Sequence, residues 1–365
     1  NFYTNGFQSL NSNNDWNASG GSYIFMAIAA NPDTTAPTKA NSFKNKIYTG
    51  NGSARSFTDI GFKPDFVWIK KRANDSKAHR LFDSVRGPNN VIYSNLTNAA
   101  ATPTDELTAF IDGGFSLGTA SAVNDGASDT YVAWSWKGLD HDRNLATINN
   151  DGSIPSIVSA NPAAGFSVVK WTGTGVDGTK IGHGLQGSPE MIITKGLSNA
   201  TSWVIGVGNI SGLSINDYFT FTSYAKANSS TFYQAYSTNT FQVGVSAANE
   251  MNKSSSNQYI SYCFRTIAGH SKIGKYTGTG VSGLEIALDF SPSFLLVKGA
   301  GATGWIIIDN QRPTPGGNYE LYANFSNTED TSATSFLLGT NKFTVNSTGT
   351  WHNTNGTDYI YLAIK

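Results

Sequence analysis

The residues of this chain best suited to recognise a ligand stand in one loop near its end. The loop reads Thr-Gly-Thr-Trp-His-Asn-Thr-Asn-Gly, with Trp351, His352 and Asn353 at its centre. An indole ring can stack on a sugar ring while nearby amides and hydroxyls hydrogen-bond to the sugar hydroxyls. Trp16 and Asn17 take the equivalent place near the start of the chain. Glycan binding at these five residues is therefore one hypothesis; the other, which we favour, is that the tryptophan folds back as a lid on its own sandwich.

The residue patterns of common catalytic and metal sites are missing from the sequence. The five histidines are scattered, none has His-Glu-x-x-His spacing, and no Gly-x-Ser-x-Gly elbow occurs. A glycosidase needs two opposed carboxylates, but adjacent acids such as Glu329 and Asp330 lie in polar loops where solvation is expected. We predict that the chain is not an enzyme and uses no metal and no cofactor.

Two glycine-rich stretches, 173–178 and 278–283, match the dinucleotide fingerprint Gly-x-Gly-x-x-Gly. That fingerprint binds pyrophosphate only where the loop opens a helix. Here the following residues return directly to a strand pattern, so tight connections between strands are the expected structure.

These stretches belong to a pattern that the chain repeats three times, with part of a fourth copy at its start. Each copy opens on aromatic-Thr-Gly-x-Gly, at 48–52, 171–175 and 276–280. A proline-led apolar strand ending in lysine follows, at 64–70, 189–195 and 292–298. Each copy closes with a Phe-led strand, a polar loop and a Tyr-led apolar strand, at 115–136, 241–264 and 343–364, with 7–28 as a fourth closing. The period of about 100–125 residues is long enough for a module to bury a core of its own.

Apolar residues alternate in the closing strands, as in a strand with one core-facing side. Val132, Trp134 and Trp136 mark the heavier face of the first copy. The opposite face is still semi-apolar, so partial cover is expected there. Short strands, frequent turn signals and the lack of a three-turn amphipathic helix predict an all-β fold of tandem antiparallel β-sandwich modules, jelly-roll-like in type.

The repeats and the linker composition predict a string of similar domains. Their expected order is an incomplete β module (1–30), a linker (31–44), module 1 (45–138), a second linker (139–164), module 2 (165–268) and module 3 (269–365). The second linker holds segments that could add a strand or two to a neighbour. Because the chain opens at Asn1 in mid-module, we also expect it to be part of something longer.

Composition argues against two classes of partner. With 14% charged residues and a net charge of zero, the chain lacks the excess of basic residues that a nucleic-acid surface needs. Its apolar runs stay far below the roughly 18–20 residues of a membrane span, so we expect no membrane insertion. Cys263 lies inside an apolar strand and is expected to be a small buried hydrophobe.

Two kinds of charged residue recur at equivalent places. Asp83 with Arg86, and Asp309 with Arg312, form matching pairs in modules 1 and 3, whereas module 2 has apolar residues there. We interpret the pairs as ion pairs that stabilise turns. The lysines that end the proline-led strands are expected to snorkel towards solvent; they are Lys70, Lys195 and Lys298.

Several stretches carry a resemblance to a known family: the junction 151–175, and the segments 61–70, 81–87 and 129–134. They resemble the repeats of tail-fibre-like virion proteins of tailed bacteriophages, especially marine ones. The similarity covers nearly the whole chain, apart from the spacer 30–41. It implies a structural protein on the virion surface, namely a fibre, a receptor-binding protein or a capsid decoration, and it supplies no established catalytic residue.

The resemblance also implies partners. These are other virion proteins and a glycan or protein of the host cell surface, approached through the last module as the tip of a fibre. By analogy with phage fibres we expect a homo-oligomer, with a trimer favoured, and the semi-apolar strand faces are the hint for it. Two alternatives remain open: a secreted bacterial array of carbohydrate-binding or adhesin modules, and a glycan depolymerase.

Overall fold

The computed structural model of the chain describes residues 2–3, 6–7, 18–23, 39–139, 147–314 and 317–365. The chain forms two compact units, residues 1–35 and 36–365. In the first unit, β1 (Phe2–Tyr3) and β2 (Gly6–Phe7) pair as an antiparallel hairpin. Most of the closing pattern predicted at 7–28 lies outside the described residues.

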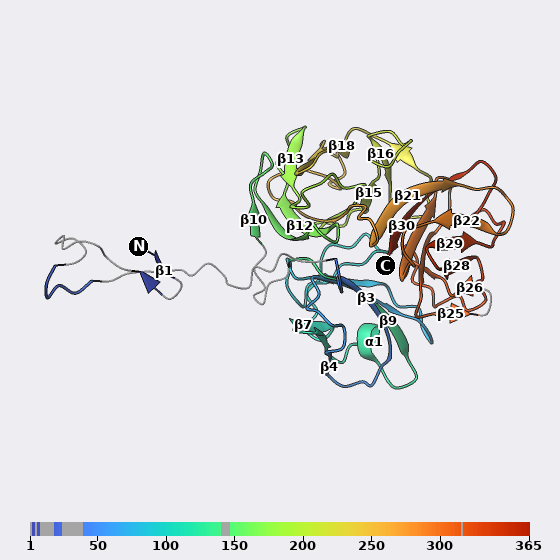
Figure 1. Cartoon of the computed structure of the whole chain (residues 1–365), viewed down its shortest axis with the longest axis horizontal. Coiled ribbons are helices and arrows are strands. Elements are labelled where there is room, and N and C mark those ends of the chain that lie inside the picture. Colours follow the sequence, from blue (N-terminus) through green and yellow to red (C-terminus); the bar gives the residue numbers. More distant parts are fainter. Residues whose placement is uncertain (1, 4–5, 8–17, 24–38, 140–146, 315–316) are drawn as a thin grey trace. The chain divides into compact units, whose positions relative to one another are not determined.

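The second unit is built from antiparallel sheets. Its one helix within the described ranges is the short α1 (Ser121–Asn124). Three sandwich-like modules follow one another, which we define as module 1 (39–139), module 2 (147–268) and module 3 (269–365), and they run from blue to teal, green to yellow and orange to red in Figure 1. The predicted all-β fold is confirmed.

Each module pairs a main sheet with a smaller second sheet, and apolar side chains from both fill the space between them. The main sheet of module 1 has the order β3 (Phe43–Thr49), β9 (Thr130–Trp136), β5 (Phe66–Lys71), β6 (Arg80–Asp83). That of module 2 is β10 (Thr147–Asn149), β11 (Ser156–Asn161), β12 (Phe166–Thr172), β20 (Gln258–Phe264), β14 (Met191–Gly196), β15 (Val204–Gly206), β16 (Asp217–Phe219), β17 (Ala227–Asn228). That of module 3 is β21 (Ser271–Thr277), β30 (Asp358–Ile364), β23 (Phe294–Gly299), β24 (Trp305–Asp309), β27 (Leu321–Tyr322).

The second sheets are three-stranded and alike. Their orders are β4 (Arg55–Phe57), β8 (Gly114–Leu117), β7 (Leu107–Ile111) in module 1; β13 (Thr179–Gly182), β19 (Thr240–Val243), β18 (Tyr233–Tyr236) in module 2; and β22 (Leu284–Ala287), β29 (Lys342–Val345), β28 (Phe336–Gly339) in module 3. Module 3 also has the hairpin β25 (Pro313–Thr314) and β26 (Gly317–Asn318). In all three modules the opening strand pairs with the closing strand, which pairs with the proline-led strand, so the sequence repeat corresponds to a repeat of topology.

Residues 147–164, the later part of the predicted linker 139–164, belong to module 2 and add two strands to it. These strands, β10 and β11, extend the main sheet, and β11 forms a hairpin with β12 in which Asn161 pairs with Phe166. Val158 and Ala160 of β11 are buried in the core of module 2. Strand β3 likewise begins at Phe43, inside the other predicted linker, whose residues 31–38 lie outside the described part of the chain.

The three modules are not separate domains on a string, because they share a core. The heavy face of each closing strand packs against the other modules, not against the second sheet of its own module. This shared core contains, from β9, β20 and β30, Trp134, Trp136, Tyr262, Phe264, Leu362 and Ile364. Its aromatic rings touch across module boundaries, as where Phe66 stacks on Tyr262 with ring centroids 4.2 Å apart.

The semi-apolar faces of the closing strands are covered within the chain as well. Tyr131 packs in the core of module 1, Tyr259 in that of module 2, and Tyr359 in that of module 3. All three are fully buried. The feature that hinted at a homo-oligomer is therefore already used inside each module.

The recurring acid–base pairs are ion pairs. The acid of each pair also accepts a hydrogen bond from a neighbouring module, and we call this arrangement a clasp. Asp83 Oδ2 lies 2.6 Å from Arg86 Nε in module 1 and accepts a 2.8 Å hydrogen bond from the Tyr262 hydroxyl of module 2. Asp309 Oδ2 of module 3 lies 2.8 Å from Arg312 Nε and accepts a 2.8 Å hydrogen bond from Trp134 Nε1 of module 1.

The junction between modules 2 and 3 replaces this clasp with hydrocarbon. Module 2 carries Val207 and Ile210 in place of the acid and the base, and module 3 carries Leu362 at the register position of Tyr262 and Trp134. All three side chains lie in the shared core. The donor and the acceptor are thus lost together at this junction, as expected because a buried unpaired polar group is costly.

Candidate functional site

Trp351 lines an open cleft in module 3. It lies in the loop between β29 and β30, and its ring stacks on Phe325 at 17° with centroids 6.1 Å apart. The ring of Tyr322 meets it edge-on at 5.6 Å. Asn327, Thr328, Glu329 and Asp330 complete a cleft of about 520 Å³. An aromatic wall beside amide and hydroxyl groups is the arrangement that suits a sugar ring.

The tryptophan also packs on its own module, as the lid hypothesis predicts. It is half-buried against the core of module 3. A Cβ added to Gly304 would lie 2.7 Å from the Trp351 six-membered ring, so this glycine makes the close approach possible. Modules 1 and 2 carry Ala78 and Ser202 before the equivalent strand.

Asn353 serves the fold of the module. It is fully buried; its Oδ1 accepts a 2.7 Å hydrogen bond from the Thr279 amide, and its Nδ2 donates to Val281 O at 2.7 Å. Asn124 and Asn252 hold the glycine-rich turns of modules 1 and 2 in the same way. Asn353 therefore does not line the cleft beside Trp351.

His352 also faces inward. Its ring meets Phe336 at 5.5 Å, and its Nε2 lies 3.3 Å from Glu320 Oε1. Its carbonyl accepts a 2.6 Å hydrogen bond from the Tyr276 hydroxyl. Of the three neighbouring residues predicted to bind a glycan, only Trp351 lines the cleft; Trp16 and Asn17 lie outside the described residues.

The glutamate at the cleft edge belongs to an ion-pair network, contrary to the expectation that it would be solvated. Glu329 receives Arg72 Nη2 at 2.7 Å and Arg312 Nη1 at 2.7 Å, and its side chain is 4% exposed. Burial raises its pKa, but the hydrogen bonds and charges of the two arginines outweigh burial, so the net pKa is lowered. An ionised, doubly paired carboxylate is unsuited to act as the general acid of a glycosidase, which needs a raised pKa.

The glycine-rich turns use their own backbone groups. Gly173 and Gly175 donate their amides to Asn257 O and Asn252 O, and Thr174 donates to the Asn252 side chain. Strands β12 and β13 flank the turn, as the sequence predicts. These amides are thus not available to a pyrophosphate.

The three strand-end lysines are buried, so the expectation that they snorkel was wrong. Lys298 Nζ donates to Thr303 O at 2.6 Å, and Lys195 Nζ donates to Thr201 O at 2.9 Å and to Thr97 O of module 1 at 3.1 Å. Lys70 Nζ donates to Lys71 O at 2.6 Å. Burial lowers the pKa of each of these three lysines to about 8. Carbonyl groups at the strand ends replace the water that snorkelling would reach.

Cys263 is buried in the core of module 2, as expected. Burial raises the pKa of its thiol to about 12. In the part of the chain that the structure describes, no group of three or more His, Cys, Asp or Glu side chains is placed to hold a metal ion. Within the same residues no helix is long and apolar enough to cross a membrane.

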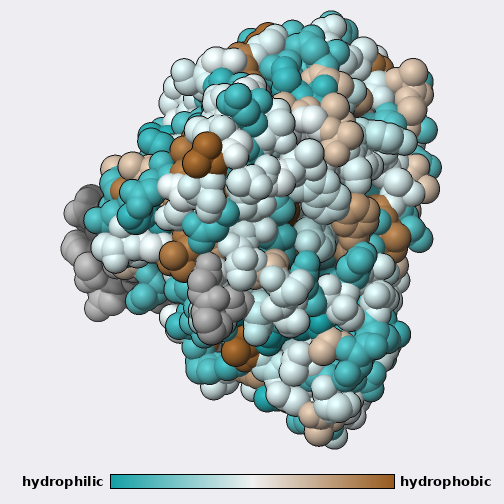
Figure 2. Space-filling model, turned by 90° about the vertical axis from the view of Figure 1, so that its right-hand side faces the viewer, coloured by the Kyte–Doolittle hydropathy of each residue, from teal (hydrophilic) through white to brown (hydrophobic). Residues whose placement is uncertain are grey.

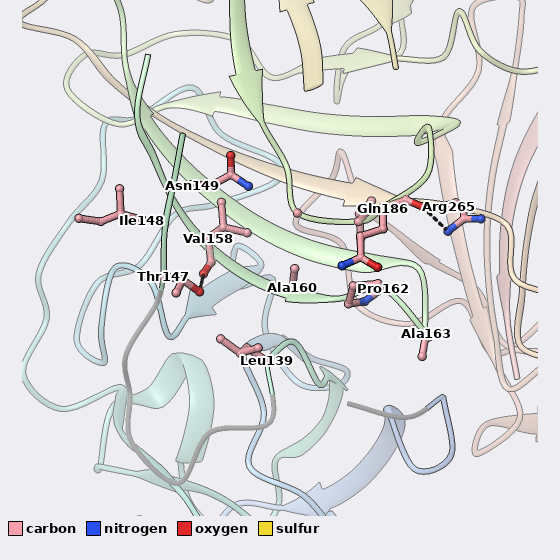
Figure 3. A pocket seen from close by; sticks show the side chains of 12 residues that line it. Leu139, Thr147, Ile148, Asn149, Val158, Ala160, Pro162, Ala163, Gln186 and Arg265 are labelled. Carbon is pink, nitrogen blue, oxygen red and sulfur yellow. Dashed lines mark hydrogen bonds between the residues drawn. The ribbon is translucent and has the colours of Figure 1, made fainter. Parts of the chain in front are cut away.

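A cavity of about 600 Å³ lies beside β10 and β11 (Figure 3). Leu139, Val158 and Ala160 form an apolar floor, and Arg265 donates to the Gln186 carbonyl at its edge. Residues 140–146, which follow Leu139, lie outside the described part of the chain, and we assign this cavity no role. On the face drawn in Figure 2, hydrophobic residues stand singly or in small groups among polar ones, which is normal for a protein surface.

Comparison with known proteins identifies a family. Residues 38–365 match the model of a family described as a domain of unknown function, DUF7483. No curated protein and no solved structure matches the chain.

Proposed function

This chain belongs to the DUF7483 family, and we propose that it is a structural, non-enzymatic appendage protein of a phage virion that contacts a host surface glycan. The observation that carries the proposal is the Trp351 cleft, which is open and joins an aromatic wall to amide and hydroxyl groups. The resemblance of the repeats to tail-fibre-like proteins supports the virion setting and the host surface as the target.

The cleft lies at one end of the unit. Lys39 Nζ donates to Ala268 O, and the Lys365 amide donates to His270 O, so the first described residue and the last residue of this unit lie at one end. Strand β30 runs towards that end from Asp358 to Ile364, a distance of about 20 Å at roughly 3.3 Å per residue. The loop that holds Trp351 precedes β30 and therefore lies at the opposite end, which we call the loop end.

The shared core removes the reason that the sequence offered for placing the host contact in module 3. The sequence suggested that the last module of a string forms the tip. The modules instead share one core, so loops of all three reach the loop end, and a place late in the chain does not single out Trp351.

The two alternatives differ in how they fit the cleft. An adhesin or carbohydrate-binding array of a bacterium would use the same aromatic wall, and only the biological setting separates it from a virion protein. A depolymerase would need a carboxyl group ready to donate a proton. Glu329 is held ionised by Arg72 and Arg312, so the cleft favours binding over hydrolysis.

The test is attachment of the labelled 365-residue chain to cells of a panel of marine bacteria. Trp351→Ala should weaken attachment about tenfold, because an aromatic contact contributes about 1–2 kcal/mol. Trp351 also packs on module 3, so a second variant, Asn327→Phe, fills the cleft from an exposed position and leaves that packing intact. Ser282→Phe, exposed on another loop of the same module, is the matched control. Attachment by a folded Asn327→Phe protein that equals the parent would reject this function.

A further inference from the structure

Three equivalent loops of the three modules meet at the loop end of the unit. A ring nitrogen at one repeated position holds each loop to the next module. Trp203 Nε1 donates to Tyr93 O at 2.8 Å, and Trp305 Nε1 donates to Thr220 O at 2.7 Å. The third member is His79, whose Nε2 lies 3.0 Å from Tyr322 O.

The proton on His79 can be assigned from its partners. Its Nδ1 accepts a 2.8 Å hydrogen bond from Trp68 Nε1, so the hydrogen must sit on Nε2, which donates to Tyr322 O. Burial holds the pKa of His79 well below its usual value, which keeps this neutral form. The three ring N–H groups therefore play the same role, and they fix the three loops around a common centre.

A pocket of about 220 Å³ lies at this centre. Trp203 and Phe221 of module 2 and Phe325 of module 3 supply its aromatic part. Asn95 and Thr97 of module 1 and Ser202 of module 2 supply polar groups. No single module could form this pocket, because its lining comes from all three.

The polar groups of the pocket are neutral; Thr222, Ser223 and Asn324 hydrogen-bond within the protein, whereas groups of Asn95, Thr97 and Ser202 are available. Asn95 Oδ1 accepts the His79 amide at 3.0 Å, which leaves its Nδ2 as a donor. Among the described residues, the hydroxyls of Thr97 and Ser202 make no hydrogen bond. The lining contains no charged side chain. An ion would be poorly compensated in such a pocket, whereas an uncharged polyhydroxy ring would pair with these donors and acceptors.

The size of the pocket limits its occupant to one ring. Pockets for drug-sized ligands measure roughly 300–1,000 Å³, and this one is smaller. Phe325 lines both this pocket and the Trp351 cleft, so the two sites share a wall. The two sites are therefore adjacent.

We propose that this central pocket binds one uncharged hexopyranose residue of the surface glycan, and that the adjoining residue of the glycan lies against Trp351. The proposal rests on the function proposed above and adds the class of sugar and a second subsite.

The test uses saturation-transfer NMR on the full chain with the methyl glycosides of glucose, galactose and mannose, and with methyl glucuronide as the charged comparison. At least one neutral glycoside should bind with a millimolar Kd, and the glucuronide should bind at least tenfold more weakly. Ser202→Phe fills the pocket from a half-exposed position and should weaken binding of the neutral glycoside tenfold or more. Ser282→Phe and Asn327→Phe should leave this binding unchanged. Thr97→Trp fills the pocket from the module 1 side and provides a second test if Ser202→Phe does not fold.

The outcomes separate this pocket from the general function. If no neutral glycoside binds up to about 50 mM, or if both pocket-filling variants bind it as the parent does, the pocket proposal is rejected. Loss of cell attachment in Asn327→Phe together with normal attachment and sugar binding in Ser202→Phe would keep the appendage function and reject the central subsite. Sugar binding that Ser202→Phe abolishes, without attachment to any cells, would keep the pocket and reject the appendage function.

Discussion

The clasp between modules 1 and 2 offers a direct test of how the modules are held together. In Asp83→Val, Arg86 would remain buried without its carboxylate, and the Tyr262 hydroxyl would lose its acceptor. Breaking one partner of a buried ion pair costs about 3–5 kcal/mol. We expect that loss in the free energy of unfolding. The exposed pair Lys46 and Asp59 is the control, and Asp59→Val should cost less than about 1 kcal/mol.

The chain itself shows how the clasp can be replaced. At the junction of modules 2 and 3 the equivalent places hold Val207, Ile210 and Leu362. The triple variant Asp83→Val, Arg86→Ile, Tyr262→Leu copies this arrangement. Its free energy of unfolding should be at least about 2 kcal/mol higher than that of Asp83→Val, because replacing a whole buried polar group by well-packed hydrocarbon is often neutral or stabilising.

The assay is urea unfolding followed by tryptophan fluorescence, since Trp134 and Trp136 lie in the shared core. A loss of about 4 kcal/mol moves the midpoint by on the order of 1 M urea. The reasoning is refuted if Asp83→Val is no less stable than Asp59→Val. It is also refuted if the triple variant is as unstable as Asp83→Val alone.

Three further predictions use the same measurement or a simple labelling reaction. Burial lowers the pKa of His183 and His270 to about 4 and holds that of His79 well below its usual value. The unfolded chain therefore binds more protons than the folded chain between pH 6.5 and 4. As the pH is lowered through this range, the free energy of unfolding should decrease by up to about 1.4 kcal/mol per pH unit for each histidine. His183→Gln should make this decrease smaller by the contribution of one histidine. Asn353→Ala should cost about 1–3 kcal/mol in urea unfolding, because it leaves the Thr279 amide without its acceptor and removes the shorter of two hydrogen bonds to the Val281 carbonyl, and an unchanged midpoint would contradict its structural role. Cys263 should resist iodoacetamide at pH 8 in the folded chain and react in urea, since its thiol is buried with a pKa of about 12; rapid labelling without urea would show that the core of module 2 opens.

The candidate site was predictable from the sequence only in part. Trp351 stands out because an indole among Asn, Thr and Gly is unusual in a loop. His352 and Asn353 share its neighbourhood, but their side chains turn inward, and the only signal for this was the recurrence of Asn124 and Asn252 in the loop between the two closing strands of the other copies. The second aromatic wall, Phe325, is 26 positions from Trp351 and carries no pattern that links the two.

The sequence by itself determined the strands, their alternation and the threefold repeat, because these depend on local patterns and on the comparison of one copy with another. It marked the heavy face of the closing strands correctly as buried. It could not say what that face packs against, since a strand that is apolar on both sides fits a module core and a shared core equally well. Tertiary structure decided this: Asp83 meets Tyr262 across 179 positions and Trp134 meets Asp309 across 175. The pocket between the loops exists for the same reason, because residues so distant in sequence come together only when the three heavy faces close on one another.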